Sequence, residues 1–471
     1  MLSHALSRVA ALVVLCLAVP SCLPPFDHPC ETDDDCRTKY GMCRCHKGLC
    51  FVFDCPAMPD VTNSELPAHV PLDVAEVSET TPSCLAATLG PADACCPLLT
   101  GARDADPDCV LGRYTPPVDA TELGGLASGA DLFLTLRRSG ARLVRHGGNL
   151  ALKDEAELGA HAGPLPVPVI TGARVVVAFD DAMPIYDATD LSRGALATFT
   201  PPSATSLAAG PSVLADGTLV LALSDGSLRH LRDDGTAAGP AKAHLDLAPK
   251  GPGLATDGNA VFVSVADGRV ARLDKGYATV AWLDLGTAGP AATSPVLGGP
   301  HLVVVGTSSG ALGGAVRVDQ DWLPLEPATL GVVADALLVA TGGLIVVVSA
   351  KVLVGVEIVG QKARVAWQRT SMNLRVGSAA LVGTAATLVF GQTATIGLAA
   401  LSLGTSSASD RWSHAVTGAD VESVLPQSDG TLVIAQRSGA LVHLYGEAAL
   451  GAHPWPRSRA DAGNTSRVRV P

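Results

Sequence analysis

The chain has 471 residues, 12 of them cysteines, and a formal net charge of −12; 48% of its residues are hydrophobic although only 4% are aromatic. An acidic chain without basic clusters argues against nucleic acid and against an anionic lipid surface as partners. The apolar content comes mostly from Ala, Val, Leu and Gly, a composition that is typical of many short buried strands.

The N-terminus has the pattern of a bacterial lipoprotein signal peptide. MLSHALSR is a short basic start, and VAALVVLCLAV is an apolar segment too short for a transmembrane helix, which needs about 20 apolar residues. The VPSC that ends at Cys22 resembles a lipobox, in which the cysteine is lipidated after cleavage. We therefore expect residues 1–21 to be removed and Cys22 to carry lipid. Pro20 is unusual in this motif, so ordinary cleavage and secretion is the alternative.

Ten further cysteines predict a disulfide framework. Residues 22–55 hold the lipidated start and a cysteine-rich knot, residues 56–83 a Pro-rich acidic linker, and residues 84–115 a second cysteine-containing segment. Cysteines crowded into a short part of an exported chain are typical of disulfides, which stabilise segments too small to bury a core. Their pairing stays open. The candidates are Cys30, Cys36, Cys43, Cys45, Cys50, Cys55, Cys84, Cys95, Cys96 and Cys109.

Residues 116–471 repeat a unit of about 40 residues. The clearest copy is SVLADGTLVLALSDGSLRHLRDDGT, residues 212–236, and units begin near residues 117, 166, 211, 253, 294, 332, 378 and 423. Each unit has a short apolar strand, an Asp-Gly or Gly-Gly turn, an alternating strand, a second turn and two more strands. This pattern predicts an all-β, eight-bladed β-propeller of four-stranded antiparallel blades. The number is seven if the weak unit near Pro117 is a connector.

One run within the repeats raises the alternative of a membrane span. GVVADALLVATGGLIVVVSA, residues 331–350, is almost entirely apolar. It contains Asp335, Gly342-Gly343 interrupts it, and β-branched residues crowd its second half. Two strands joined by a glycine turn are therefore the better interpretation.

The repeats resemble the PQQ-like (quinoprotein-type) β-propeller family. AWLDLGTAGPAATSPVLGG, residues 281–299, carries the resemblance best, with a Trp-bearing strand, a glycine and a loop to Ser-Pro-x-Val. PWPRSRADAGNTSR, residues 454–467, resembles a segment often found beside such repeats. With the lipobox, these features resemble BamB-like propeller lipoproteins, to which the cysteine-rich module is an addition. The tryptophans that recur about once per unit are Trp282, Trp322, Trp367 and Trp412.

The quinone site of that family is not matched. Its dehydrogenases hold PQQ and Ca²⁺ on the propeller axis with a convergent set of oxygen ligands, and often place an adjacent cysteine pair inside the propeller. Here the adjacent pair Cys95-Cys96 precedes the first blade. A role in turns explains most carboxylates of the repeats. These are Asp216, Asp225, Asp233, Asp234, Asp257, Asp267 and Asp429.

Two other patterns suggest metal sites but are better explained otherwise. Asp104, Asp106 and Asp108 resemble the start of a calcium loop, yet Pro107 and Thr115 break its pattern. The CRCH at residues 43–46 resembles a zinc ligand set, but in an oxidising compartment we expect its cysteines to be bridged. No nucleophile elbow and no phosphate loop occurs. We expect no catalytic residue, no cofactor and no metal.

The expected function is therefore a non-catalytic cell-envelope lipoprotein whose propeller is a protein-binding scaffold. Its predicted partners are other envelope or surface proteins, and it meets the membrane only through its N-terminal lipid. We expect a monomer anchored to the outer membrane, on the periplasmic face or the cell surface, or secreted if it is not lipidated. The alternative is a quinoprotein-type dehydrogenase or a carbohydrate-binding protein that uses the axial cavity of the propeller.

Overall fold

The chain divides into two compact units, residues 1–79 and residues 80–471. The computed structural model describes residues 44–46 and 49–51 of the first unit. Of the second it describes residues 110–444, except positions 162, 240–243, 259, 275–279, 287–288, 341, 384–385, 393–396, 417–419 and 429. In the first unit, β1 (Arg44–His46) and β2 (Leu49–Phe51) form a two-stranded antiparallel hairpin.

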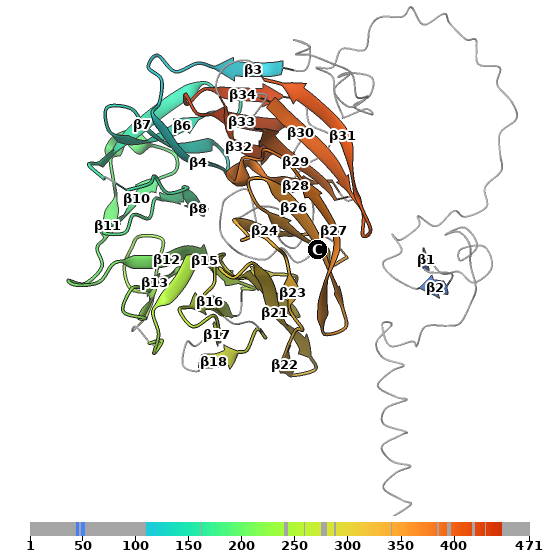
Figure 1. Cartoon of the computed structure of the whole chain (residues 1–471). Coiled ribbons are helices and arrows are strands. Elements are labelled where there is room, and N and C mark those ends of the chain that lie inside the picture. The colour runs from blue at the N-terminus through green and yellow to red at the C-terminus, as the bar shows by residue number, and fades with distance from the viewer. Residues whose placement is uncertain are drawn as a thin grey trace, which may run out of the picture. The chain divides into compact units, whose positions relative to one another are not determined.

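The second unit is a ring of eight antiparallel sheets, which confirms the predicted eight-bladed β-propeller (Figure 1). Blade 1 consists of β4 (Glu122–Ser128), β5 (Leu132–Arg137), β6 (Ala141–His146) and β7 (Leu152–Gly159). Blade 2 consists of β8 (Val169–Thr171), β9 (Arg174–Val176), β10 (Met183–Asp187) and β11 (Ala197–Phe199), with the short 3₁₀ helix η5 (Leu191–Arg193) before β11. Blade 3 has β12 (Leu207–Val213), β13 (Leu219–Leu223) and β14 (Leu228–Leu231). Blade 4 has β15 (Pro249–Thr256), β16 (Val261–Val265), β17 (Val270–Leu273) and β18 (Val280–Leu283).

The other half of the ring repeats this order. Blade 5 contains β19 (Val296–Leu297), β20 (Leu302–Gly306), β21 (Ala311–Val318) and β22 (Asp321–Pro324), and β23 (Ala328–Thr329) also pairs with β21. Blade 6 contains β24 (Ala336–Val339), β25 (Ile345–Val348), β26 (Val352–Val359) and β27 (Lys362–Thr370). Blade 7 begins after the 3₁₀ helix η6 (Val376–Ser378) and contains β28 (Ala380–Val382), β29 (Thr387–Gln392), β30 (Gly397–Leu403) and β31 (Ala408–Ala415). Blade 8 contains β32 (Val421–Pro426), β33 (Leu432–Gln436) and β34 (Leu441–Leu444).

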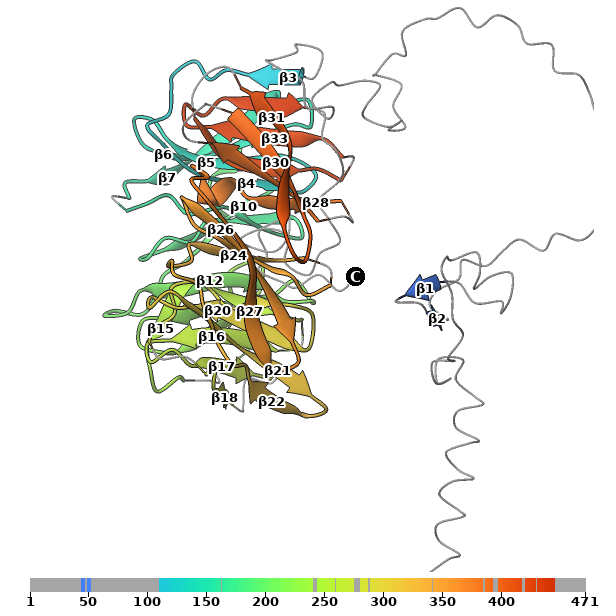
Figure 2. The ribbon, with the colours of Figure 1, turned by 45° about the vertical axis from the view of Figure 1, so that its right-hand side comes forward.

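The outer strand of blade 8 comes from the other end of the domain. β3 (Val110–Tyr114) pairs antiparallel with β34, from Val110 opposite Leu444 to Tyr114 opposite Leu441. Figures 1 and 2 both show this cyan strand beside the red strands of the last blade. The sheet thus joins the first described strand of the domain to the last and closes the ring. The predicted propeller began at residue 116 and left this strand out.

The two strands expected in the long apolar run are present. β24 and β25 pair antiparallel, and the turn between them contains Gly342 and Gly343. All residues of both strands are buried. Among the described residues, no helix is long and apolar enough to cross a membrane.

Alternation along a strand divides its side chains between two neighbouring blades. In β13, Leu219, Leu221 and Leu223 pack on residues of blade 2 that include Met183 and Ile185. The residues between them, Val220 and Ala222, pack on blade 4 instead. All five residues of β13 are therefore buried, because blades cover both faces of the sheet.

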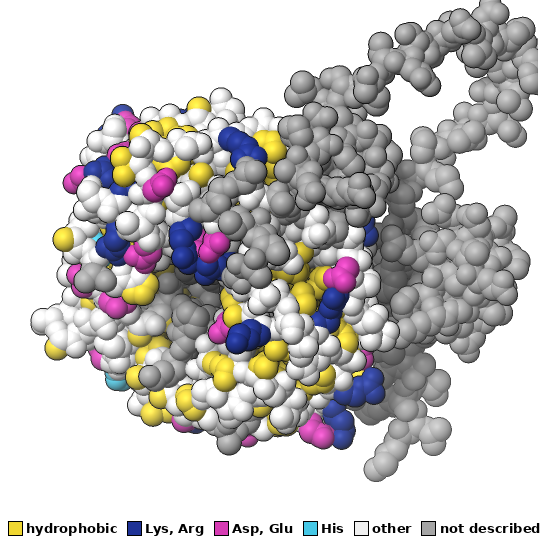
Figure 3. Space-filling model, turned by 45° about the horizontal axis from the view of Figure 1, so that its top comes forward, with side chains coloured by type: hydrophobic (Ala, Val, Ile, Leu, Met, Phe, Trp, Pro, Cys, Tyr) yellow, Lys and Arg dark blue, Asp and Glu magenta, His cyan; other side chains and the backbone are white. Residues whose placement is uncertain are grey.

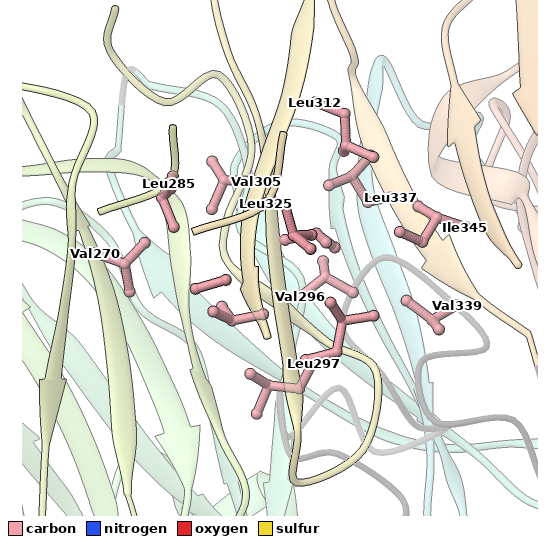
Figure 4. Packing of buried hydrophobic residues seen from close by; sticks show 14 of the residues in the cluster. Val270, Leu285, Val296, Leu297, Val305, Leu312, Leu325, Leu337, Val339 and Ile345 are labelled. Atoms are coloured by element: carbon pink, nitrogen blue, oxygen red, sulfur yellow. The ribbon is translucent and has the colours of Figure 1, made fainter. Parts of the chain in front are cut away.

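The largest apolar cluster joins blades 4, 5 and 6 (Figure 4). In it, Val270 and Leu285 meet residues of blade 5 such as Val305, and these in turn meet Leu337 and Ile345 of blade 6. The contacts are between aliphatic side chains that are almost completely buried. Each buried aliphatic side chain contributes about 1.5–3 kcal/mol of transfer free energy, so these seams supply much of the stability.

The recurrent tryptophans occupy equivalent places. Trp282, Trp322, Trp367 and Trp412 all lie in the outermost strands of consecutive blades, which are β18, β22, β27 and β31. Trp367 is buried and donates its indole N–H to the carbonyl oxygen of Gly404 in the next blade, at 3.0 Å. Trp367 thus helps to hold blades 6 and 7 together.

Candidate interaction surface

One face of each blade carries the loops that enter the inner strand and the turns that leave the second strand. In blade 1, Glu122 at the start of the inner strand is opposite Arg137 at the end of the second strand. In blade 8, Val421 and Gln436 occupy the same places. Because every blade has the same strand order, these loops and turns share one side of the ring, which we name the loop face.

Charged side chains gather on the loop face where blades 7 and 8 meet. The Arg375 Nη2 atom, just before η6, lies 2.7 Å from Asp420 Oδ2 and 3.5 Å from Glu422 Oε1. Arg437, in the turn after β33, contacts the same Glu422 oxygen through Nε at 2.9 Å. Two cations and two anions, from the segment before η6, the start of β32 and the turn after β33, therefore form one partly exposed network.

A backbone hydrogen bond carries this network into blade 1. The N–H of Ala120 donates to the carbonyl oxygen of Ser438 at 2.7 Å, next to Arg437. Two residues further on, Glu122 accepts from Arg137 Nε at 2.8 Å and from the Leu165 N–H at 2.9 Å. Burial alone would raise the pKa of Glu122, but these two hydrogen bonds and the charge of Arg137 lower it below its usual range. These neighbours thus favour the anionic form of Glu122.

Arg137 Nη1 also donates to the carbonyl oxygen of His161, which extends the network to blade 2. The His161 ring stacks on Phe179 with centroids 3.6 Å apart and an interplanar angle of 8°. Its Nδ1 atom lies 3.3 Å from Asp181 Oδ1, and the side chain of Asp181 is 76% exposed. We name the whole set the charged strip; its members are Glu122, Arg137, His161, Asp181, Arg375, Asp420, Glu422 and Arg437.

The chemistry of the charged strip suits binding. Each carboxylate of the strip lies beside a guanidinium or an imidazole, an arrangement typical of an ionic network. In the part of the chain that the structure describes, no three His, Cys, Asp or Glu residues form a group that could hold a metal ion. On the face that Figure 3 shows, basic and acidic side chains lie in small mixed groups with no large area of one sign. Such a surface favours partners with matched, mixed charges.

The structure confirms the turn role of most repeat aspartates. Asp216, Asp225, Asp234 and Asp267 each accept the backbone N–H of the residue two positions on, at 2.8–3.1 Å. Asp257 accepts the N–H of Ala260 at 2.7 Å. Asp233 is exposed, and Asp429 lies outside the described residues.

The structure describes few of the predicted lipid and disulfide positions. Cys45 and Cys50 are opposite each other in the register of β1 and β2. Cys22, the candidate Cys30, the calcium-loop aspartates and the other candidate cysteines lie outside the described residues. Their roles stay predictions.

Two polar relays were not predicted from the sequence. The Thr218 hydroxyl contacts Asp216 Oδ1 and His230 Nε2, both at 2.6 Å. In blade 8, Thr431 and His443 make the same contact at 2.7 Å with the same separation of 12 residues. The sequence signal for these contacts was a D-G-T turn followed by a strand that ends in H-L, and only these two repeats contain both motifs.

Comparisons with known proteins support the fold alone. No protein-family model matches the chain, and no curated protein matches it. Among solved structures, the chain is similar to the C-terminal WD40 domain of Sif2, with a TM-score of 0.52, 9% identity, and coverage of 70% of this chain and 99% of that one. BamB from Moraxella catarrhalis has a TM-score of 0.49 at 16% identity, covering 71% of this chain and 99% of that one. The computationally designed Ika8 protein has a TM-score of 0.47 at 14% identity, with coverage of 70% and 98%. The chain is a β-propeller with distant structural similarity to these proteins.

Proposed function

We propose that this protein is a non-catalytic cell-envelope lipoprotein whose propeller binds other proteins through the charged strip of its loop face. The envelope location depends on the signal pattern and on lipid at Cys22, both of which are sequence predictions. The sequence resemblance to BamB-like lipoproteins supports a scaffold of this class. The fold by itself does not identify a binding partner.

The rigidity of the loop face is the observation that carries the proposal. Its turns at Asp225 and Asp267 are fixed by the aspartate side chains, each of which accepts the N–H of the residue two positions on. Loops of adjacent blades are tied by backbone hydrogen bonds, as between Leu245 and Gly226 at 2.8 Å and between Leu330 and Gly310 at 2.9 Å. A surface that is ordered before binding loses little conformational entropy when a partner docks.

The charge pattern favours a protein partner. Nucleic acid binding depends on a basic surface that neutralises phosphates, whereas the charged strip alternates cations with anions and the whole chain has a net charge of −12. Alternating charges give specificity and orient a partner that has the complementary pattern. We therefore infer envelope or surface proteins as partners of a monomeric propeller.

The test combines partner identification with a measured affinity. Crosslinking of the full chain in envelope fractions identifies the partner, and binding of the purified pair is then measured. Arg437→Glu places a second anion beside Glu422, so we expect at least a tenfold weaker affinity. Arg364→Glu is the matched control, because Arg364 is 72% exposed on β27 and contacts Glu357 outside the charged strip.

Two outcomes would overturn the proposal. Equal effects of Arg437→Glu and Arg364→Glu would show that the strip is not the binding surface. Dye-linked alcohol oxidation after incubation with PQQ and Ca²⁺ would show that the protein is a quinoprotein enzyme.

A further inference from the structure

The seam that closes the ring contains ionisable side chains beside its apolar cluster. Between blades 2 and 3 the packed residues are aliphatic, as with Met183, Ile185 and Leu221. Where β3 meets blade 1, Tyr114 packs on His146 with ring centroids 4.4 Å apart at an angle of 65°. We name this set the closing seam; its members are Tyr114, Arg138, Arg142, His146 and Glu155.

The hydrogen bonds of His146 fix where its proton lies. Its Nδ1 atom is 3.0 Å from the carbonyl oxygen of Leu150, and a carbonyl only accepts, so Nδ1 carries the hydrogen. The Nε2 atom is therefore a lone-pair acceptor in the neutral ring. The residue is completely buried, and Nε2 has no hydrogen-bond partner. The neighbouring Tyr114 hydroxyl is also buried and unpaired.

The charges around His146 oppose a second proton. Burial lowers the pKa of His146 most, the Leu150 carbonyl raises it, and the guanidinium of Arg138 lowers it further. The Arg138 side chain is 11% exposed; its Nε and Nη2 atoms are buried without a hydrogen-bond partner, and Nη1 lies 3.5 Å from Glu155 Oε2. The other oxygen of Glu155 accepts from Arg142 at 2.7 Å, so this one carboxylate already faces two cations. From β33 and β34, Val433, Ala435 and Leu441 belong to the apolar cluster of this seam.

We propose that His146 makes the closing seam acid-sensitive, so that its protonation loosens the attachment of β3 and thereby opens the ring. The imidazolium would be buried without an acceptor for its Nε2–H, and the positive charge of Arg138 would oppose it. When the seam opens, water can solvate the imidazolium. Acidification therefore favours the open state, independently of whether the charged strip binds a partner.

The sign of the effect follows from proton linkage. A histidine whose folded pKa lies below the ordinary 6.5 stabilises the closed state above that pH. Below it, the open state binds one more proton than the closed state. The opening constant then rises by up to about tenfold per pH unit until the folded pKa is reached.

Hydrogen exchange of the full chain at pH 7.5 and 5.5, corrected for intrinsic exchange rates, tests the proposal. We expect opening of β3 and β34 to increase up to about tenfold at pH 5.5 while β15 and β16 change less. His146→Gln, which cannot be protonated, should remove the increase. His301→Gln, at an exposed position between β19 and β20, is the matched control and should retain it.

Two results would overturn the proposal. One is an equal response to pH in the protein and in His146→Gln. The second comes from nitrogen NMR of the unsubstituted protein, which should show His146 as the neutral Nδ1–H tautomer at pH 6. A titration midpoint of 6.5 or higher for His146 would refute the proposal.

Discussion

Two glycines of blade 4 allow the cost of backbone strain to be measured separately from the cost of a clash between blades. Gly258 and Gly268 both follow aspartate in a turn, and both have a φ of +89°. A Cβ on Gly258 would lie 3.4 Å from the Cβ of Ala215, a tight but tolerable distance. A Cβ on Gly268 would lie 2.1 Å from the carbonyl oxygen of Gly289, in the loop that leads to blade 5. The two alanine variants therefore share the cost of a left-handed backbone, but only Gly268→Ala adds a clash with the neighbouring loop.

The magnitudes follow from these distances. Gly258→Ala should lose about 1–2 kcal/mol of unfolding free energy, the cost of a left-handed backbone with a side chain. Gly268→Ala should lose a further amount of about 1–3 kcal/mol, because a backbone carbonyl must move to make room. Urea unfolding of both variants, compared at a common slope, measures the difference. Equal losses would show that this contact between turn and loop does not hold the blades together.

Three more predictions concern the relay, a buried ion pair and the N-terminus. The hydrogen bond from Thr218 lowers the pKa of Asp216 below 3.8, so the ionised carboxylate stabilises the fold above that pH. Thr218→Val should therefore lower the urea midpoint at pH 7, and the variant should lose less additional stability than the unsubstituted protein when the pH falls to about 3. Arg145, 11% exposed, binds a carboxylate with two nitrogens, so Arg145→Met should cost about 3–5 kcal/mol in urea unfolding, whereas Arg193→Met, at a 68% exposed position, should cost about 0–1 kcal/mol. Mass spectrometry should find a mature protein that begins at an acylated Cys22; an unmodified Cys22 or a start at Leu23 would refute lipidation.

The blades could be predicted because each is encoded locally. The unit at residues 212–236 contains its own turns and its own alternating strand, and these features form hairpins wherever they occur. The eight predicted starts consequently agree with the inner strands within a few residues, from 117 against Glu122 to 423 against Val421. The weak first unit is a complete four-stranded blade, which decides the count in favour of eight.

The closing strand could not be predicted in the same way. VLGRY, residues 110–114, pairs with a strand that lies more than 300 residues away in sequence, and nothing in its own pattern names that partner. The charged strip has the same difficulty. Arg375 and Asp420 are 45 positions apart and meet only because consecutive blades place their entry loops side by side. Charges near strand starts were visible, but their pairing depends on ring geometry.

Both polar features fall where the two ends of the propeller meet. The charged strip crosses from blade 8 to blade 1 beside the loop that follows β3, and in the closing seam Tyr114 of β3 packs on His146 of blade 1. In sequence, Cys109 directly precedes Val110, so the cysteine-rich region is joined to the closing strand with no spacer. Removing that region together with β3 would expose the hydrogen-bonding edge of β34, and exposed edges promote association between chains. Binding and acid sensitivity must therefore be measured on the full chain, since a propeller that lacks β3 would report on an opened ring.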